Sequence, residues 1–197
     1  VPILRAELEA VRDTGVEVIQ IDEPHLSGFC DPVERVKFDD PDTDLDFLVE
    51  SLNGVVEGIE GPTIALHICR FNRARLGTTN NGGYEPIVPA LHKIRVDQFT
   101  LEFAIPQAGD MRVLNELPED VHVALGCVDC RSAEIDTPEQ IVERVETAMR
   151  FLPKERISLA PDCGFAPGAG MKIPLDEAYT KLKNEVEAAR ILRERYA

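Results

Sequence analysis

Four residues of metal-binding type stand at or just after the ends of short β-rich segments. His67 and Cys69 lie two residues apart, so on a strand their side chains share one face. Glu102 closes a later segment, and Cys163 comes just after another. Zinc takes imidazole, thiolate and carboxylate ligands in tetrahedral sites. Together the four residues predict one bound Zn2+ ion, although each of them alone is more typical of an ordinary buried side chain.

The elements that must position these residues alternate between strand and helix. We expect five strands, at residues 17–21, 63–68, 98–103, 121–125 and 156–159. Helical patterns lie around them, at residues 4–13, 44–56, 85–93 and 138–152 and from 175 to the C-terminus. The clearest helix start is Thr137-Pro138-Glu139-Gln140, in which threonine caps, proline takes the first helical position and glutamine completes a capping box. This alternation predicts a parallel sheet with crossover helices.

The two faces of the expected strands differ in polarity. In residues 98–103 apolar side chains alternate with polar ones, and residues 17–21 end in the same pattern. A sheet between two helix layers is apolar on both faces, whereas a (β/α)8 barrel gathers polar side chains at the top of its lumen. We therefore predict an α/β fold of the (β/α)8 TIM-barrel type. Because such a barrel needs eight strands, we expect residues 1–197 to form a single domain that covers roughly the C-terminal five βα units.

Composition excludes several classes of partner. The chain has 197 residues and a formal net charge of −15 at pH 7, so most of its surface would repel nucleic-acid backbones and anionic lipid headgroups. Its longest apolar runs are far shorter than the ~20 residues that span a bilayer. No export signal is evident, and we expect a cytoplasmic protein that binds neither nucleic acid nor membrane. In that compartment the five cysteines stay reduced and are available to a metal ion.

Several segments resemble, in order and spacing, the catalytic domain of cobalamin-independent methionine synthase and its shorter relatives. They extend over nearly the whole chain and are Ile19-Gln20-Ile21-Asp22-Glu23-Pro24, His67-Ile68-Cys69-Arg70, Leu101-Glu102-Phe103 and Pro161-Asp162-Cys163-Gly164-Phe165. Each segment is weak evidence alone, but the ordered set is specific. The resemblance places the chain in the zinc methyltransferase barrel superfamily, which is shared with uroporphyrinogen decarboxylase-like proteins.

The resemblance implies a function and roles for individual residues. It implies an S-methyltransferase that moves a methyl group from 5-methyltetrahydrofolate, as its polyglutamate, or from a methyl-corrinoid to the thiol of homocysteine, giving methionine. It implies the four residues above as zinc ligands, and it implies that Asp22 binds the amino group of homocysteine, with Glu23 beside it in the substrate site. A carboxylate is released more easily than a thiolate, so we expect Glu102 to be the ligand that yields to the substrate sulfur.

Two positions depart from the longer enzymes of this family. Gly28 stands where those enzymes carry an acidic residue that contacts folate, and Arg131 stands where they carry a proton-donating histidine. An arginine cannot serve as a general acid near neutral pH, but it can bind a carboxylate of the substrate or of the donor. We therefore expect Arg131 to act in the site in that way, and the identity of the methyl donor stays open.

Three alternatives remain at the level of sequence. A related zinc barrel could transfer a thiol such as coenzyme M to an epoxide, or the chain could be a non-catalytic fragment with a structural zinc site. Cys127 and Cys130, with His25 and Cys30, could form a second zinc site, although buried thiols are the better interpretation. Because an incomplete barrel has two open edges, we expect self-association, or pairing with a missing N-terminal half.

Overall fold

The computed structural model describes residues 1–166 and 173–197. Its strands are β1 (Val18–Asp22), β2 (Thr63–His67), β3 (Gln98–Glu102), β4 (His122–Val128) and β5 (Ile157–Pro161). Its α-helices are α1 (Pro2–Arg12), α2 (Leu26–Cys30), α3 (Pro32–Arg35), α4 (Pro41–Val56), α5 (Val88–Leu91), α6 (Pro138–Ala148) and α7 (Leu175–Tyr196). Short 3-10 turns lie between them. All five predicted strands are present, each within a few residues of its expected bounds.

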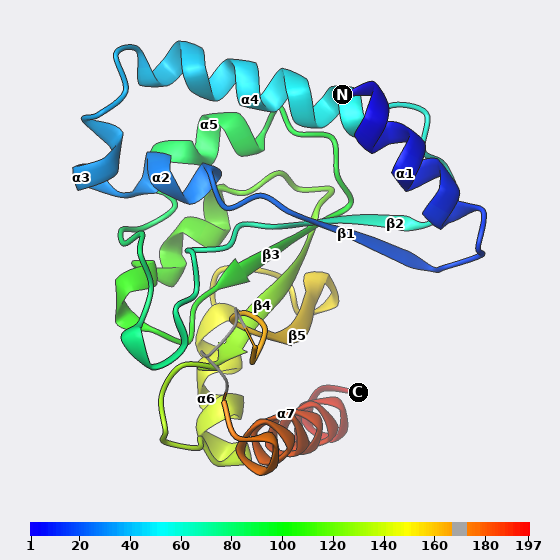
Figure 1. The fold of residues 1–197 in the computed structure, drawn as a ribbon. Coiled ribbons are helices and arrows are strands. Elements are labelled where there is room, and N and C mark those ends of the chain that lie inside the picture. Colours follow the sequence, from blue (N-terminus) through cyan, green and yellow to red (C-terminus); the bar gives the residue numbers. More distant parts are fainter. Residues whose placement is uncertain (167–172) are drawn as a thin grey trace.

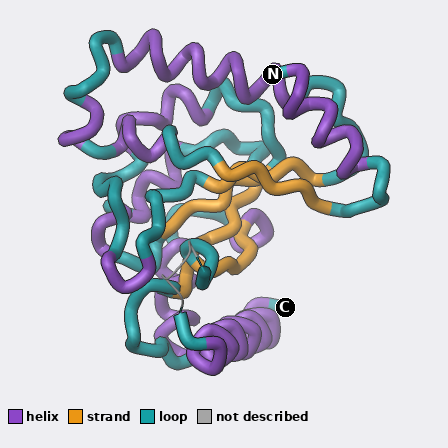
Figure 2. The backbone as a smooth tube through the Cα atoms, in the orientation of Figure 1, coloured by secondary structure: helices purple, strands orange, loops and turns teal. Residues whose placement is uncertain are grey.

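The five strands form one parallel sheet in the order β1-β2-β3-β4-β5. Each strand therefore pairs with the next one along the chain, and a helical or irregular crossover returns the chain to the start of the following strand (Figure 1). All carboxyl ends consequently lie at one end of the sheet, where the strands run into loops (Figure 2). The predicted α/β class with a parallel sheet is confirmed, and the sheet is open, with β1 and β5 at its edges.

Alternation along the strands separates an apolar face from a polar one. Leu66, Ile68, Phe99 and Leu101 are fully buried and pack in the main core with residues of α4, α5 and α6. The opposite face carries the polar side chains. There the Thr100 hydroxyl of β3 lies 3.1 Å from the side-chain oxygen of Gln20 in β1. Side chains from alternate strands thus meet on the polar face, across β2.

The helix starts follow from local chemistry. Thr137 and Gln140 form the predicted capping box, in which each side chain accepts a hydrogen bond from the other residue's backbone N–H. Asp40 caps α4 by accepting the N–H of Thr43 at 3.2 Å. The acidic residues at the beginning of α4 therefore belong to a helix terminus, where negative charge is favourable.

Two helical regions differ from the sequence prediction. Residues 85–93 form a 3-10 turn followed by the short α5, because Pro86 and Pro89 lack the N–H groups that a continuous helix would need. Between β1 and α4 the chain forms α2 and α3, which the hydrophobic pattern did not indicate. Asp31 starts α3 by accepting the N–H groups of Val33 and Glu34.

No helix within the described residues has both the length and the apolar character needed to cross a membrane.

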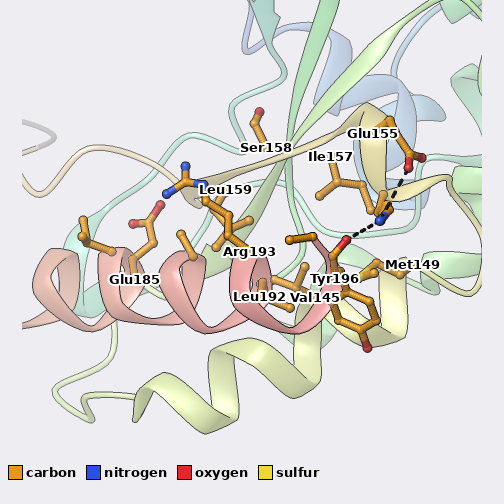
Figure 3. Close-up of a pocket in the computed structure, with 14 residues that line it drawn as sticks. Val145, Met149, Glu155, Ile157, Ser158, Leu159, Glu185, Leu192, Arg193 and Tyr196 are labelled. Atoms are coloured by element: carbon orange, nitrogen blue, oxygen red, sulfur yellow. Dashed lines mark hydrogen bonds and ion pairs between the residues drawn. The ribbon is translucent and has the colours of Figure 1, made fainter.

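A groove of about 780 Å³ opens between the edge strand β5 and helix α7. Figure 3 shows Glu185 and Leu192 of α7 and Ile157 and Leu159 of β5 among the side chains that line it. Glu185 is only 8% exposed, and its Oε2 atom has no hydrogen-bond partner within the described part of the chain. Burial raises the pKa of this carboxyl to about 7. The groove thus combines apolar side chains with charged ones, and Glu185 is a poorly solvated acidic group within it.

Glu185 is expected to make the stability of this chain pH-dependent. The pKa of Glu185 is about 7 in the folded state and 4.5 in an ordinary solvated carboxyl. Between pH 4.5 and 7 the folded state therefore binds more protons at this group than the unfolded state does. The free energy of unfolding should therefore fall as pH rises from 5 to 8, by up to about 3 kcal/mol. Urea unfolding should show that Glu185→Gln makes this decrease smaller, while the buried carboxyl of Asp162, whose pKa is also raised to about 7, contributes to the decrease that remains. Glu187→Gln, at a partly exposed position on the same helix, should keep the full decrease. A decrease in Glu185→Gln as large as that of wild type would contradict the assignment.

Candidate metal centre

The four predicted ligand residues come together at the carboxyl ends of the strands. His67 ends β2 and Glu102 ends β3, while Cys69 and Cys163 follow β2 and β5 within two residues. One donor atom from each residue lies within 4.8 Å of the others. Among the residues that the structure describes, this is the one cluster of histidine, cysteine and acidic side chains with such geometry. Residues from three non-adjacent parts of the chain thus converge on one point.

The spacing of the donor atoms suits a tetrahedral zinc ion. The Sγ atoms of Cys69 and Cys163 are 3.6 Å apart, and His67 Nε2 is 3.6 Å from Glu102 Oε1. Zinc bonds of about 2.0–2.3 Å in a tetrahedron put neighbouring donors roughly 3.3–3.8 Å apart. The two sulfur atoms are also too distant for a disulfide, which needs about 2.05 Å. The donor set and its dimensions therefore fit zinc.

The electrostatics of the cluster favour a cation. Burial alone would lower the pKa of His67, but the contact with Glu102 and the neighbouring thiol and carboxylate charges outweigh burial and raise it. A hydrogen bond from the thiol of Cys163 lowers the pKa of Cys69. One thiolate and one carboxylate therefore converge beside an imidazole. Such a concentration of negative charge is what a divalent metal ion would compensate.

Asp22 orients the imidazole of His67. Its Oδ1 atom lies 3.2 Å from His67 Nδ1, and the same oxygen accepts a hydrogen bond from Gln20. A carboxylate at Nδ1 favours the tautomer with its proton there, which would leave the Nε2 lone pair for a metal ion. Nε2 also lies 3.2 Å from the backbone carbonyl oxygen of Asp162. The side chain of Asp22 is still 63% exposed, so it also remains accessible to a small molecule.

Glu102 is completely buried and is held through both of its oxygen atoms. Oε1 accepts the backbone N–H of Arg70 at 2.9 Å and faces His67. Oε2 is paired with the guanidinium of Arg131. Tyr84 adds support, because its hydroxyl accepts the backbone N–H of Glu102 at 2.9 Å. The carboxylate therefore has one fixed orientation.

Asp162, which the sequence did not single out, connects the ends of β3 and β5. Its Oδ1 accepts the N–H groups of Phe103 and Ala104 at 3.0 and 2.9 Å. Its Oδ2 accepts a hydrogen bond from Arg131 at 3.0 Å. Burial and the nearby Glu102 raise the pKa of Asp162 to about 7, against the opposing effect of Arg131. Only its position beside Cys163 could have drawn attention to it.

Gly126 of β4 makes room for this connection. A Cβ atom at that position would lie 2.5 Å from Asp162 Oδ1 and 2.6 Å from the Leu101 carbonyl oxygen. Both distances are too short for any side chain. Position 126 of β4, which lies between β3 and β5, must therefore lack a side chain so that Asp162 can contact the end of β3.

Replacing Gly126 with alanine is expected to destabilise the protein by about 1–3 kcal/mol, because the extra methyl group must displace buried backbone. Chemical denaturation of the two proteins measures the effect. Gly164→Ala is the matched control, since a Cβ there meets nothing within 4 Å and should leave stability nearly unchanged. Equal stabilities of Gly126→Ala and wild type would show that Asp162 does not need this space.

The remaining candidate residues lie in different surroundings. The Glu23 carboxylate accepts the N–H of His25 at 2.8 Å, a local contact before α2. Arg131 is 5% exposed and faces Glu102 and Asp162 of its own chain. Cys127 and Cys130 are buried and are not members of the cluster, and burial raises the pKa of both thiols. Within the described residues they form no second group of metal-binding side chains.

Comparison with known proteins gives relatives over almost the entire chain. A methionine synthase from Pyrococcus abyssi is 33% identical over 193 residues, which cover 97% of this chain and 48% of that protein. A 5-methyltetrahydropteroyltriglutamate–homocysteine methyltransferase from Bacillus velezensis is 28% identical over 195 residues, which cover 98% of this chain and 23% of that protein. The chain thus spans about half the length of the shorter relative and about a quarter of the longer one.

A solved structure has the same fold. The B12-independent methionine synthase from Shewanella sp. W3-18-1, solved in complex with selenomethionine, superposes with a TM-score of 0.80 at 23% sequence identity. The match covers 98% of this chain and 53% of that one. The family model described as the cobalamin-independent synthase catalytic domain matches residues 1–191. The sequence, the fold and the relatives named as methyltransferases agree, and the chain belongs to the cobalamin-independent methionine synthase catalytic-domain family.

Proposed function

We propose that this chain is the thiol-activating part of a zinc-dependent methyltransferase that methylates homocysteine to methionine. The observation that carries the proposal is the cluster of His67, Cys69, Glu102 and Cys163 at the carboxyl ends of the strands. Barrel enzymes place their chemistry at this end. The names of the relatives support methyl transfer to homocysteine and do not favour transfer of a thiol to an epoxide.

Asp22 and Glu102 are proposed to have different roles in binding the substrate. Bound zinc would lower the pKa of a coordinated thiol and so supply a thiolate at neutral pH. The exposed carboxylate of Asp22 is suited to bind the amino group of homocysteine while it orients His67. Glu102 is the ligand most readily replaced by the substrate sulfur, because its carboxylate already has Arg131 and the Arg70 N–H as partners.

The methyl donor is proposed to be 5-methyltetrahydrofolate or a methyl-corrinoid. Gly28 is buried in α2 and offers no side chain to a folate ring. A donor that does not depend on an acidic group at this position therefore suits the chain. Either donor could give its methyl group to a thiolate: the C–N bond of 5-methyltetrahydrofolate would break with protonation of the N5 amine, and the C–Co bond of a methyl-corrinoid would break with the electron pair left on cobalt.

We further propose that the five βα units of this chain belong to a (β/α)8 barrel completed by the rest of a longer protein. On the polar face of the sheet Gln20 and Thr100 meet from alternate strands, as in the layers that fill a barrel. Apolar side chains are exposed beside both open edges, including Val18 of β1 and Val186 of α7. The groove at Glu185 would then face the added part.

A matrix of thiols against methyl donors, assayed with the natural protein that contains this chain, tests the proposed function. We expect turnover only with homocysteine and one of the two donor classes. X-ray absorption at the zinc edge should also show one additional sulfur ligand when homocysteine is added. An unchanged ligand set and no turnover with either donor would favour a structural zinc site and overturn the proposal.

A further inference from the structure

The geometry points to Arg131 as a positioning residue that holds Glu102 in place for the metal ion and ties it to the segment that carries Cys163. This inference rests on the proposed zinc site and extends it to a residue outside the ligand set. The sequence suggested that Arg131 binds a carboxylate of the substrate or of the donor. The inferred role is instead a contact with carboxylates of the protein itself. The argument depends on how the guanidinium is held, what it holds and how accessible it is.

The loop that carries Arg131 is itself fixed from several sides. The carboxylate of Asp129 accepts the N–H groups of Arg131 and Ser132 at 2.8 and 3.3 Å, which closes a tight turn after β4. Lys181 of α7 is buried and donates to the Asp129 carbonyl oxygen at 2.8 Å. Arg75 donates to the carbonyl oxygen of Arg131 at 2.6 Å. The backbone of Arg131 therefore has a defined position before its side chain makes any contact.

From this position the guanidinium bridges two buried carboxylates. Nη2 pairs with Glu102 Oε2, and Nη1 lies 3.0 Å from Asp162 Oδ2. Both carboxylates are 0% exposed at their side chains. Asp162 directly precedes Cys163, so one guanidinium connects the segment of one proposed ligand to the side chain of another. The planar fork of arginine makes two such contacts at once, which a lysine ammonium cannot reproduce.

The contact also decides which oxygen of Glu102 faces the cluster. With Oε2 turned toward Arg131, Oε1 is directed at His67 Nε2, 3.6 Å away. Without the guanidinium, Glu102 and Asp162 would be two uncompensated buried acidic groups in close proximity, which is costly. We expect the Glu102 side chain to leave its present orientation in that case, because little else neutralises its outer oxygen.

Burial argues against a direct role of Arg131 with the substrate. The residue is 5% exposed, and its two terminal nitrogens are already paired with groups of this chain. A substrate carboxylate would have to displace Glu102 or Asp162 to reach them. Asp22, by contrast, is exposed at the same end of the sheet.

The test measures zinc affinity in the absence of substrate. In the natural protein that contains this chain, Arg131→Met should weaken zinc binding about 10–100-fold, the usual effect of removing a group that orients a ligand. Chelator competition gives the affinity. X-ray absorption should show the two sulfur ligands retained and the oxygen ligand lost. Arg131→Lys keeps the positive charge but not the planar fork, so its zinc affinity should lie between those of Arg131→Met and wild type. Because it leaves no uncompensated buried carboxylates, it also controls for misfolding of Arg131→Met.

Arg144→Met is the matched control, because the Arg144 guanidinium also pairs with a carboxylate, that of Asp136, and bonds the Cys127 carbonyl oxygen in β4, but it contacts no proposed ligand. It should bind zinc like wild type. The inference would be overturned if both Arg131 variants kept the zinc affinity and the ligand set of wild type but had a raised KM for homocysteine. That result would indicate that Arg131 binds the substrate. If Cys69→Ser loses zinc in the same assay, that result leaves the proposed function standing. A wild-type protein that binds no zinc would overturn both.

Discussion

Replacing Cys69 or Cys163 with serine is expected to remove most of the zinc from a protein that otherwise holds close to one ion per chain. A four-ligand zinc site is worth ~10–16 kcal/mol, so one ligand contributes roughly 3 kcal/mol, or about two orders of magnitude in affinity. The remaining Sγ, Nε2 and Oε1 atoms stay in place but leave one corner of the tetrahedron open. Elemental analysis after gentle purification measures the loss.

Two other cysteines provide the control for this experiment. Cys127 and Cys130 are as buried as any residues of the core, yet neither belongs to the cluster. Cys127→Ser and Cys130→Ser should therefore keep a full complement of zinc. Full retention in both Cys69→Ser and Cys163→Ser would contradict the assignment, whereas loss in the Cys127 or Cys130 variants would point to a second site.

The 197-residue chain on its own is expected to bind zinc but to transfer methyl groups orders of magnitude more slowly than the longer protein that contains it. Methyl transfer requires the donor carbon and the thiolate sulfur to be held at near-attack distance, and misplacement by about 1 Å can cost 100-fold in rate. In the proposed barrel, loops outside this chain contribute to that alignment. Turnover of the isolated chain against the longer protein measures the difference.

Light scattering on the same samples tests the state of the open edges. Within residues 1–166 and 173–197, β1 and β5 each have a neighbouring strand on one side only, and unpaired strand edges favour association. We expect the isolated chain to self-associate through the β1 edge, or to bind the missing half when it is supplied as a separate chain. A monomer with the turnover of the longer protein would show that five strands suffice, and the proposal of a completed barrel would be wrong.

Much of the fold was predictable because its signals are local. The strand positions follow from alternating apolar residues, and the start of α6 follows from Thr137 and Gln140, which are three residues apart. The interruption of residues 85–93 was also encoded locally, by Pro86 and Pro89, but the apolar pattern outweighed these residues in the prediction. The short helices α2 and α3 were not predicted, because so few residues show too little hydrophobic periodicity to be recognised as a helix.

The candidate ligand set was predictable for a related reason. A side chain at the carboxyl end of a parallel strand is placed at one end of the sheet whatever the crossovers look like, so residue type and strand position sufficed for His67 and Glu102. Cys163 was harder, since Pro161 interrupts the alternation before it. The cluster within 4.8 Å brings it beside the others.

Only the tertiary structure decided what surrounds these residues. Sequence chemistry identified Arg131 as a charge near the site, but the choice between a substrate and Glu102 as its partner depends on three strands and a loop meeting in space. The contact of Asp162 with the end of β3 likewise requires a residue without a side chain, Gly126, in the intervening strand β4. Residue types and spacing along the chain thus determined which groups could do chemistry. Long-range packing determined which of them face one another, because a side chain 29 or more positions away leaves no periodic trace in the sequence.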